Sequence, residues 1–147
     1  MGGSKEFRVP GRYDRISDIC DFIAIGAEEA GFGEDDIFRI QLACDEACTN
    51  VIQHAYGSED VDDIWAKWQF DDYAFAITIR DKGRSFNPKD VPMPNIPVGP
   101  DEIDKLQIGG LGMHFMRTLM DEIRFFFHDN SGNELVMVKK LPSTDKS

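Results

Sequence analysis

The sequence predicts an α+β fold: a two-layer α/β sandwich in which a mixed, largely antiparallel sheet carries its helices on one face. Two stretches, 13–30 and 35–56, repeat apolar residues with helical spacing. Two others, 63–80 and 123–141, alternate apolar and polar residues around short turns, which predicts antiparallel hairpins. Because helical and strand segments are partly segregated along the chain, a layered architecture is favoured over alternating βαβ units.

Each of the two expected helices has one apolar face. The first ends at Gly31, and its apolar positions are Ile16, Ile19, Ile23, Ala27 and Ala30. The second begins at Asp35 or Asp36 and ends at Gly57. Its apolar positions are Ile37, Ile40, Cys44, Ala47, Val51 and Ala55. We expect both faces to pack against the sheet.

The expected strands differ in how much apolar surface they offer. A short first strand holds Phe7 and Val9. The last hairpin joins 123–128 to 134–141. In the strand at 73–80, one face is expected to be buried, and it consists of Tyr73, Phe75, Ile77 and Ile79.

The region 87–108 breaks this regularity. Five of the seven prolines lie between residues 87 and 106. A long irregular loop inside a compact domain is typical of a lid or a binding loop. A third helix is expected at 111–121. With 147 residues in all, we expect a single domain, 1–147, whose ordered core runs from about 7 to 141.

The charge and the cysteines restrict the class of partner and the compartment. The formal net charge is −11, from 27 acidic and 16 basic residues. Nucleic acids and anionic membranes attract clustered Lys and Arg, so the charge argues against both and favours protein partners. No apolar run approaches bilayer-spanning length, and the odd number of cysteines favours free thiols in a reducing cytoplasm. A cytoplasmic protein is expected.

A polar stripe follows the second helix at four-residue spacing: Glu46, Asn50 and His54. Mg²⁺ binds through one or two protein oxygens together with phosphates, so the Asn50 side-chain oxygen is a candidate ligand. Glu46, one turn earlier, is a candidate base that orients an attacking hydroxyl. Taken alone, the stripe is better explained as a solvated polar face.

A second polar motif, Asp81-Lys82-Gly83, follows a strand. A carboxylate at the end of a strand can accept a hydrogen bond from an exocyclic amine such as that of adenine. Gly83 allows a positive φ and the close approach of a flat ring, and Phe86 could add apolar contact. The alternative is an ordinary Asp-x-Gly turn.

The third motif is a glycine-rich segment, Gly109-Gly110-Leu111-Gly112, which opens the third expected helix. Exposed backbone N–H groups and the helix dipole make such a terminus suitable for phosphate. It lacks the Lys-Ser/Thr pair of a P-loop and follows a loop rather than a strand.

In this order, the three motifs resemble those of GHKL-type (histidine-kinase-like) ATPase domains, in the branch of anti-sigma regulatory factors with serine/threonine kinase activity (the RsbW/SpoIIAB type). The segment 45–56 is similar to the N box of that family. The segments 81–86 and 109–122 are similar to its first and second glycine boxes. The similarity extends from about residue 7 to 141.

The resemblance implies an α/β sandwich that binds ATP and Mg²⁺ between the helical layer and an ATP lid. It implies that Asn50 holds Mg²⁺, Glu46 is the catalytic base, Asp81 contacts the adenine amine and the glycines contact phosphate. Many members carry a Gly-Thr pair before the last strand, with the Thr near adenine. Here Gly132-Asn133 occupies that place, and Asn133 can both donate and accept a hydrogen bond.

Family members bind a sigma factor, phosphorylate a small antagonist protein and are commonly dimers. The resemblance therefore implies an anti-sigma-type regulatory kinase with these partners. The sequence leaves open a nucleotide-gated binding module with little phosphotransfer, and a simple ATPase that uses water as the nucleophile.

Overall fold

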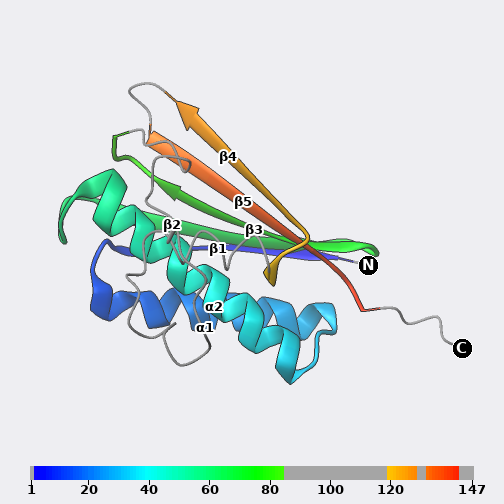
Figure 1. Cartoon of the computed structure of the whole chain (residues 1–147). Coiled ribbons are helices and arrows are strands. Elements are labelled where there is room, and N and C mark those ends of the chain that lie inside the picture. Colours follow the sequence, from blue (N-terminus) through cyan, green and yellow to red (C-terminus); the bar gives the residue numbers. More distant parts are fainter. Residues whose placement is uncertain (1, 85–118, 129–131, 143–147) are drawn as a thin grey trace, which may run out of the picture.

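The computed structural model describes residues 2–84, 119–128 and 132–142. Two helices lie on one face of a five-stranded sheet (Figure 1). The strand order is β1-β2-β3-β5-β4, and each of the four pairings is antiparallel. The elements are β1 (Gly3–Pro10), η1 (Tyr13–Arg15), α1 (Ile16–Ala30), α2 (Glu34–Asn50), η2 (Val51–Tyr56), β2 (Asp63–Phe70), β3 (Ala74–Asp81), β4 (Glu122–His128) and β5 (Gly132–Lys140).

The predicted two-layer α+β fold is therefore confirmed, and the part of the sheet that is described contains no parallel pair. The first strand is longer than expected, because Gly3 to Pro10 pair along the whole of β2. An edge strand forms hydrogen bonds on one side only, and its ladder needs few apolar side chains. The proline-rich region 87–108 and most of the third expected helix, 111–118, lie outside the described residues.

The apolar faces of the helices form the core, as predicted. Ile19, Ile23 and Ala27 of α1 are fully buried against the sheet. Trp68 of β2 packs between the layers, in aromatic contact with Phe75 at 6.3 Å between ring centroids. The prediction was wrong for Tyr73, which precedes β3 and is 79% exposed. It lies in the turn between β2 and β3 and not in a strand.

The second helix changes form at its end. We expected one α-helix to Tyr56, but α2 ends at Asn50 and η2 continues it as a π-helix. Gly57, with φ 82°, ends the helical segment as predicted. π-Helical turns widen the backbone and are often found at functional sites.

The three cysteines are free and buried. Burial raises the pKa of the Cys44 and Cys48 thiols well above the ordinary value, so they behave as small apolar core residues. Among the described residues, no helix is long and apolar enough to cross a bilayer.

Candidate functional site

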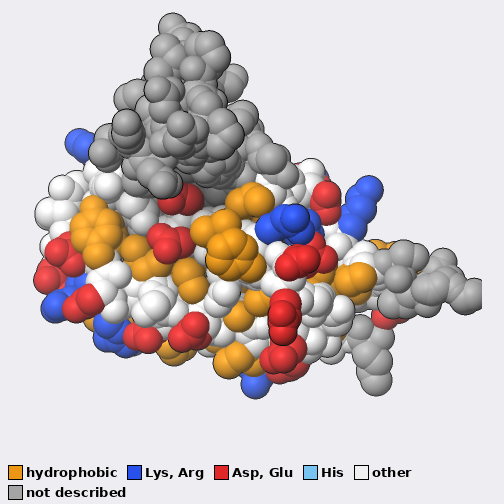
Figure 2. Space-filling model, turned by 60° about the horizontal axis from the view of Figure 1, so that its bottom comes forward, with side chains coloured by type: hydrophobic (Ala, Val, Ile, Leu, Met, Phe, Trp, Pro, Cys, Tyr) orange, Lys and Arg blue, Asp and Glu red, His pale blue; other side chains and the backbone are white. Residues whose placement is uncertain are grey.

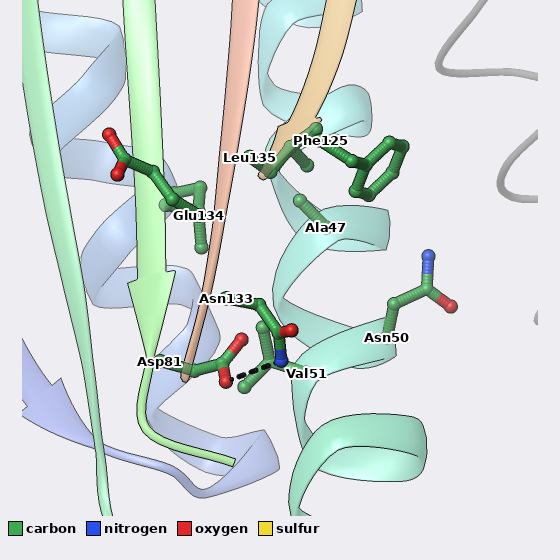
Figure 3. Close-up of a pocket in the computed structure, with 9 residues that line it drawn as sticks. Ala47, Asn50, Val51, Asp81, Phe125, Asn133, Glu134 and Leu135 are labelled. Carbon is green, nitrogen blue, oxygen red and sulfur yellow. Dashed lines mark hydrogen bonds between the residues drawn. The ribbon is translucent and has the colours of Figure 1, made fainter. Parts of the chain in front are cut away.

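Asp81 ends β3 in a buried corner, and Figure 3 shows its carboxylate hydrogen-bonded to Asn133. The Gly83 N–H donates to Asp81 Oδ1 at 2.8 Å, and Asn133 Nδ2 donates to the same oxygen at 2.9 Å. Burial raises the pKa of the Asp81 carboxyl, and these hydrogen bonds oppose the shift. Oδ2 takes part in neither of these two hydrogen bonds.

The register of the sheet brings Asn133 to this corner, because Asp81 of β3 lies directly opposite Asn133 of β5. Asn133 Nδ2 also donates to the Arg84 carbonyl at 2.9 Å. Its Oδ1 is buried and has no hydrogen-bond partner in the described parts of the chain. Gly132, with φ +99°, allows the start of β5 to lie this close to the Asp81 backbone, since a Cβ at Gly132 would lie 1.9 Å from the Asp81 carbonyl oxygen.

The structure explains the glycine at position 83 in a different way from the sequence prediction. The φ angle of Gly83 is not positive. A Cβ at Gly83 would instead lie 2.5 Å from the Ala55 carbonyl oxygen of η2. The close approach that the structure shows at this glycine is to the backbone of η2.

Hydrogen bonds fix the Asp81 turn to the end of η2. The Arg84 N–H donates to the Ala55 carbonyl at 3.0 Å, and Arg84 Nε donates to the His54 carbonyl at 3.1 Å. The Tyr56 hydroxyl accepts from the Lys82 N–H at 3.0 Å and donates to the Asp63 carbonyl. The last carbonyls of a helix lack partners within the helix, so this turn satisfies them.

A pocket lies between α2 and the ends of β3 and β5 (Figure 3). Asn50 of α2 lines it on the helical side, and Asp81 and Asn133 line it on the sheet side. The remaining lining residues are mostly apolar: Ala47, Val51, Ile79, Phe125, Glu134 and Leu135. The pocket is small, with a volume of about 10 Å³, which is roughly the space of one water molecule.

Asn50 is only 2% exposed, so the solvated-face interpretation is wrong for this residue. Both of its amide atoms are buried without a hydrogen-bond partner among the described residues, and its side chain points away from Asp81 (Figure 3). An unsatisfied buried polar group costs about 1–3 kcal/mol, which a polar ligand can offset.

Glu46, one turn before Asn50, is half-buried and also has an unpartnered oxygen, Oε2, within the described structure. Burial, with a smaller contribution from the neighbouring Asp45 charge, raises the pKa of Glu46 to about 7. A general base works best when its pKa lies near the operating pH.

The Asn50 side-chain oxygen is better suited to Mg²⁺ than to a metal ion coordinated by protein side chains alone. No group of three or more His, Cys, Asp or Glu residues able to hold a metal occurs in the described chain. Mg²⁺ is commonly held by one or two protein oxygens, with phosphate and water completing its shell. The buried Asn50 Oδ1 is suited to that role.

Comparison with known proteins gives the family. A profile of the histidine kinase-like ATPase domain matches residues 9–139. The serine-protein kinase RsbW of Bacillus velezensis is 31% identical over 137 residues, which covers 92% of this chain and 84% of that protein. RsbW of Bacillus mycoides is 35% identical over 140 residues, with the same coverage. The chain belongs to the histidine kinase-like ATPase family.

A solved structure was also found, the histidine kinase domain of the blue-light activated histidine kinase from Erythrobacter litoralis EL346. It aligns with a TM-score of 0.44 at 18% identity, over 90% of this chain and 62% of that one.

In this member of the histidine kinase-like ATPase family, three of the predicted site residues line one pocket: Asn50, Asp81 and Asn133. Glu46 lies one helical turn from that pocket, and Gly83 lies behind Asp81 against η2. The other predicted site residues fall outside the described parts of the chain, namely Phe86, Gly109, Gly110, Leu111 and Gly112.

Sequence reasoning missed the apolar lining of the pocket. Phe125 and Leu135 belong to strands whose alternation marks them only as core. Ala47 and Val51 belong to the apolar face of the second helix, which has the same signal as any buried helix. No pattern in the sequence separates a pocket wall from the rest of the core.

Proposed function

We propose that this chain is an ATP-dependent serine/threonine protein kinase that binds Mg-ATP, sequesters a regulatory partner and phosphorylates a small antagonist protein. The observation that carries the proposal is the Asn50 amide, which is buried and unpartnered in the described structure, on the helix that borders the pocket lined by Asp81 and Asn133. The serine-protein kinase name of the RsbW relatives supports the reaction class.

At the adenine end of the site, Asp81 would accept a hydrogen bond from the exocyclic amine. The two donors on Oδ1 hold the carboxylate in one orientation, which favours recognition of a planar ligand edge. Asn133, beside it, would supply its unpartnered Oδ1 as a further acceptor. Gly83 would support this end indirectly, because it keeps the turn against η2.

At the phosphate end, Asn50 would hold Mg²⁺ through its side-chain oxygen. The ion, when bound, neutralises charge on the phosphates. The glycine-rich segment Gly109-Gly110-Leu111-Gly112 would contact the phosphates through its backbone N–H groups, and Phe86 would add apolar contact to the nucleotide. Residues 87–108 would form the lid.

Glu46 would act as the catalytic base. The hydroxyl oxygen of a serine or threonine on the antagonist attacks the γ-phosphorus. The bond from that phosphorus to the β–γ bridging oxygen breaks, and ADP leaves. The hydroxyl proton passes to the Glu46 carboxylate, whose pKa of about 7 keeps a substantial fraction of it ionised at neutral pH.

The partners follow from the family and the charge. We propose a sigma factor or an analogous regulator as the sequestered protein, an antagonist protein as the phosphate acceptor, and a homodimer as the assembly. Direct nucleic-acid and membrane contacts are disfavoured by the net charge of −11. A cytoplasmic location is consistent with these partners.

The test measures binding and transfer separately. Calorimetry with ATP, with and without Mg²⁺, gives affinity, and γ-labelled ATP with candidate antagonists from the same cell gives transfer. Glu46→Gln should lower the rate of transfer by about 10²–10⁴-fold with ATP affinity nearly unchanged. Glu28→Gln, the same change on the exposed surface of α1, is the matched control.

Each result has a clear meaning. Equal transfer by Glu46→Gln would remove Glu46 from the mechanism. Stable ATP-dependent complexes without label transfer would favour a nucleotide-gated binding module. Phosphate release without any protein acceptor would favour a simple ATPase.

A further inference from the structure

A second hollow lies on the outer side of the helical layer, between α1 and α2 and away from the sheet. We call it the α1/α2 groove. Figure 2 shows the helical side of the molecule, where exposed apolar side chains are interspersed with acidic ones. The groove is lined by Tyr13, Ile16, Ser17, Cys20, Asp21, Phe38, Gln41, Leu42, Asp45 and Thr49.

Large apolar side chains are unusually exposed here. Phe38 is 61% exposed, Tyr13 is 45% exposed and Leu42 is 42% exposed. Single exposed apolar residues are ordinary, but these three line the same hollow. Phe38 and Leu42 are one helical turn apart, so they form a stripe on α2 that is separate from its core face.

The charged residues that line the groove are all acidic. Asp21 and Asp45 line it, and none of its ten lining residues is Lys or Arg. Thr49 Oγ1 donates to Asp45 Oδ1 at 3.3 Å, which holds that carboxylate at the groove.

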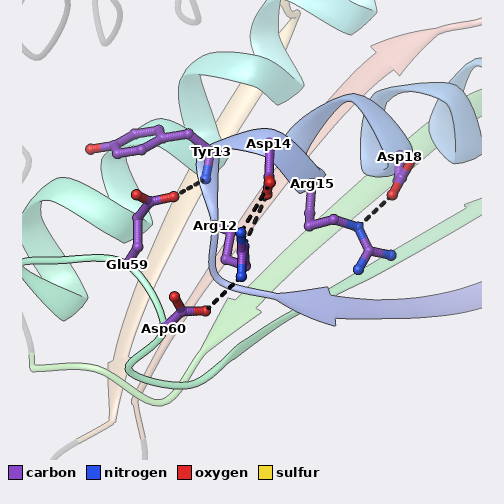
Figure 4. Close-up of polar contacts among 7 residues, drawn as sticks. All are labelled: Arg12, Tyr13, Asp14, Arg15, Asp18, Glu59 and Asp60. Atoms are coloured by element: carbon purple, nitrogen blue, oxygen red, sulfur yellow. Dashed lines mark hydrogen bonds and ion pairs between the residues drawn. The ribbon is translucent and has the colours of Figure 1, made fainter.

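The arginines near the end of the groove are already engaged (Figure 4). Arg12 Nε contacts Asp14 at 3.0 Å, and its Nη1 lies 3.7 Å from Asp60. Arg15 Nε contacts Asp18 at 2.6 Å. These pairs offset the positive charge locally, so the groove itself keeps its negative character.

We propose that the α1/α2 groove is a docking site for a helix of a partner protein that presents large apolar side chains flanked by Lys or Arg. Apolar anchors would cover Phe38, Leu42 and Tyr13, and the basic side chains would pair with Asp21 and Asp45. An amphipathic helix laid in a groove is a common recognition mode.

The charge argues against a second copy of this chain as the occupant. A two-fold interface places the same patch on both subunits, so the acidic groups would face one another. Such like-charge contacts are unfavourable at an interface. A basic partner removes this repulsion.

The groove and the proposed catalytic residues share α2. Asp45 precedes Glu46, and Thr49 precedes Asn50. A docked helix would therefore contact residues adjacent to the proposed base and metal ligand. The inference goes beyond the kinase proposal, because docking at this groove requires no nucleotide.

The experiment uses the full chain without nucleotide and two fluorescein-labelled helical peptides of about 18 residues with Leu and Phe at i, i+3, i+4 and i+7. One peptide carries Lys at the flanking positions, and the other carries Glu. Fluorescence anisotropy is measured for the wild type, for Phe38→Ala with Leu42→Ala, and for Asp21→Lys with Asp45→Lys. Tyr73→Ala, at an exposed aromatic far from the groove, is the control.

The Lys peptide should bind the wild type and Tyr73→Ala equally, and at least about tenfold more tightly than the Glu peptide. The double alanine variant should weaken binding by about tenfold or more. The double lysine variant should prefer the Glu peptide. Absent binding, or equal binding by all variants, would overturn the proposal. So would a wild-type dimer that sedimentation shows to dissociate in the double alanine variant, because the occupant would then be a second copy. ATP binding is scored separately, so a failed kinase proposal leaves this result interpretable.

Discussion

The Asp81 corner and the Glu46–Asn50 stripe differ in how their buried polar groups are satisfied. At the corner, Asp81 Oδ1 accepts from Gly83 and Asn133, and Arg84 bonds to the carbonyls of η2. On the stripe, Asn50 has two buried amide atoms and Glu46 one buried oxygen without partners among the described residues. Contacts within the protein hold the corner, where Asn133 Oδ1 is the one atom of the Asp81–Asn133 pair that is buried without a partner among the described residues. On the stripe, both Asn50 and Glu46 have such unpartnered atoms, and no side-chain hydrogen bond within the described structure fixes either residue.

This difference indicates that the two regions are suited to different parts of a ligand. A satisfied network is rigid, so it can select a ligand edge of fixed geometry. Unsatisfied groups reduce stability until something binds them, so they fit an ion or phosphate that contributes its own bonds. The following changes test whether the two regions behave in these opposite ways.

Among the changes that compare the two regions, the largest effect is expected from Asp81→Asn. The new side chain keeps one oxygen for Gly83 and Asn133 but presents an NH₂ donor to the adenine amine, which is itself a donor. Losing a charge-assisted bond of about 1.5–3 kcal/mol weakens ATP binding about 10- to 150-fold, as measured by calorimetry. Asp35→Asn, at an exposed position in the first turn of α2, should leave the affinity unchanged. An unchanged affinity in Asp81→Asn would exclude the proposed adenine contact.

The next effect concerns the folding of the corner. Gly83→Ala places a Cβ 2.5 Å from the Ala55 carbonyl oxygen, so backbone must move. We expect a loss of about 1–3 kcal/mol in the free energy of unfolding, measured with urea. Gly33→Ala is the control, because a Cβ there meets nothing within 4 Å. Equal stability of the two variants would mean that η2 does not constrain the turn.

Leucine substitutions compare the two regions directly. Asn50→Leu removes unpartnered polar atoms and should raise the free energy of unfolding by about 1–2 kcal/mol while abolishing the Mg²⁺ dependence of ATP binding. Asn133→Leu removes donors from Asp81 and Arg84 and should lower stability by a similar amount. Urea unfolding measures both. If both variants lost stability equally, the contrast between the regions would be wrong.

The smallest effect is the pH dependence of Glu46. Its pKa of about 7 lies above the ordinary value of 4.5, so the folded state binds the proton more tightly than the unfolded state. Its contribution to stability is therefore complete below about pH 4.5 and is lost as the pH rises through about 7. Glu46→Gln should match the wild type near pH 4.5 and exceed it by about 1 kcal/mol at pH 8, after allowance for partial exposure. Urea unfolding at both pH values checks this, and Glu28→Gln should show no such divergence.

Much of the fold was predictable because periodicity reports which side of an element is buried. The buried positions Ile19, Ile23 and Ile40 follow from helical spacing alone. Tyr73 was misjudged because alternation alone does not say where a strand begins, and β3 begins one residue later, at Ala74. The π-helix after Asn50 was missed because Val51–Tyr56 keeps an ordinary helical composition.

For the site, the motifs predicted residue types but not their environment. Asn50 was identified as a possible ligand, yet the four-residue spacing taken alone favours a solvated stripe. Only its burial at 2% exposure separates the two interpretations. Gly83 was also identified, but the contact that requires a glycine there was not. Its neighbour Ala55 lies 28 positions earlier in the chain and approaches it only in the folded protein.

By itself, the sequence determined the layers, the apolar faces of the helices and the residue types of the motifs, because these depend on local spacing and chemistry. Only the tertiary structure decided that Asp81 lies opposite Asn133 and that the Asn50 amide is buried. Strand register and helix-on-sheet packing join residues far apart in the chain. Such contacts depend on how whole surfaces fit together, and no short segment encodes that fit.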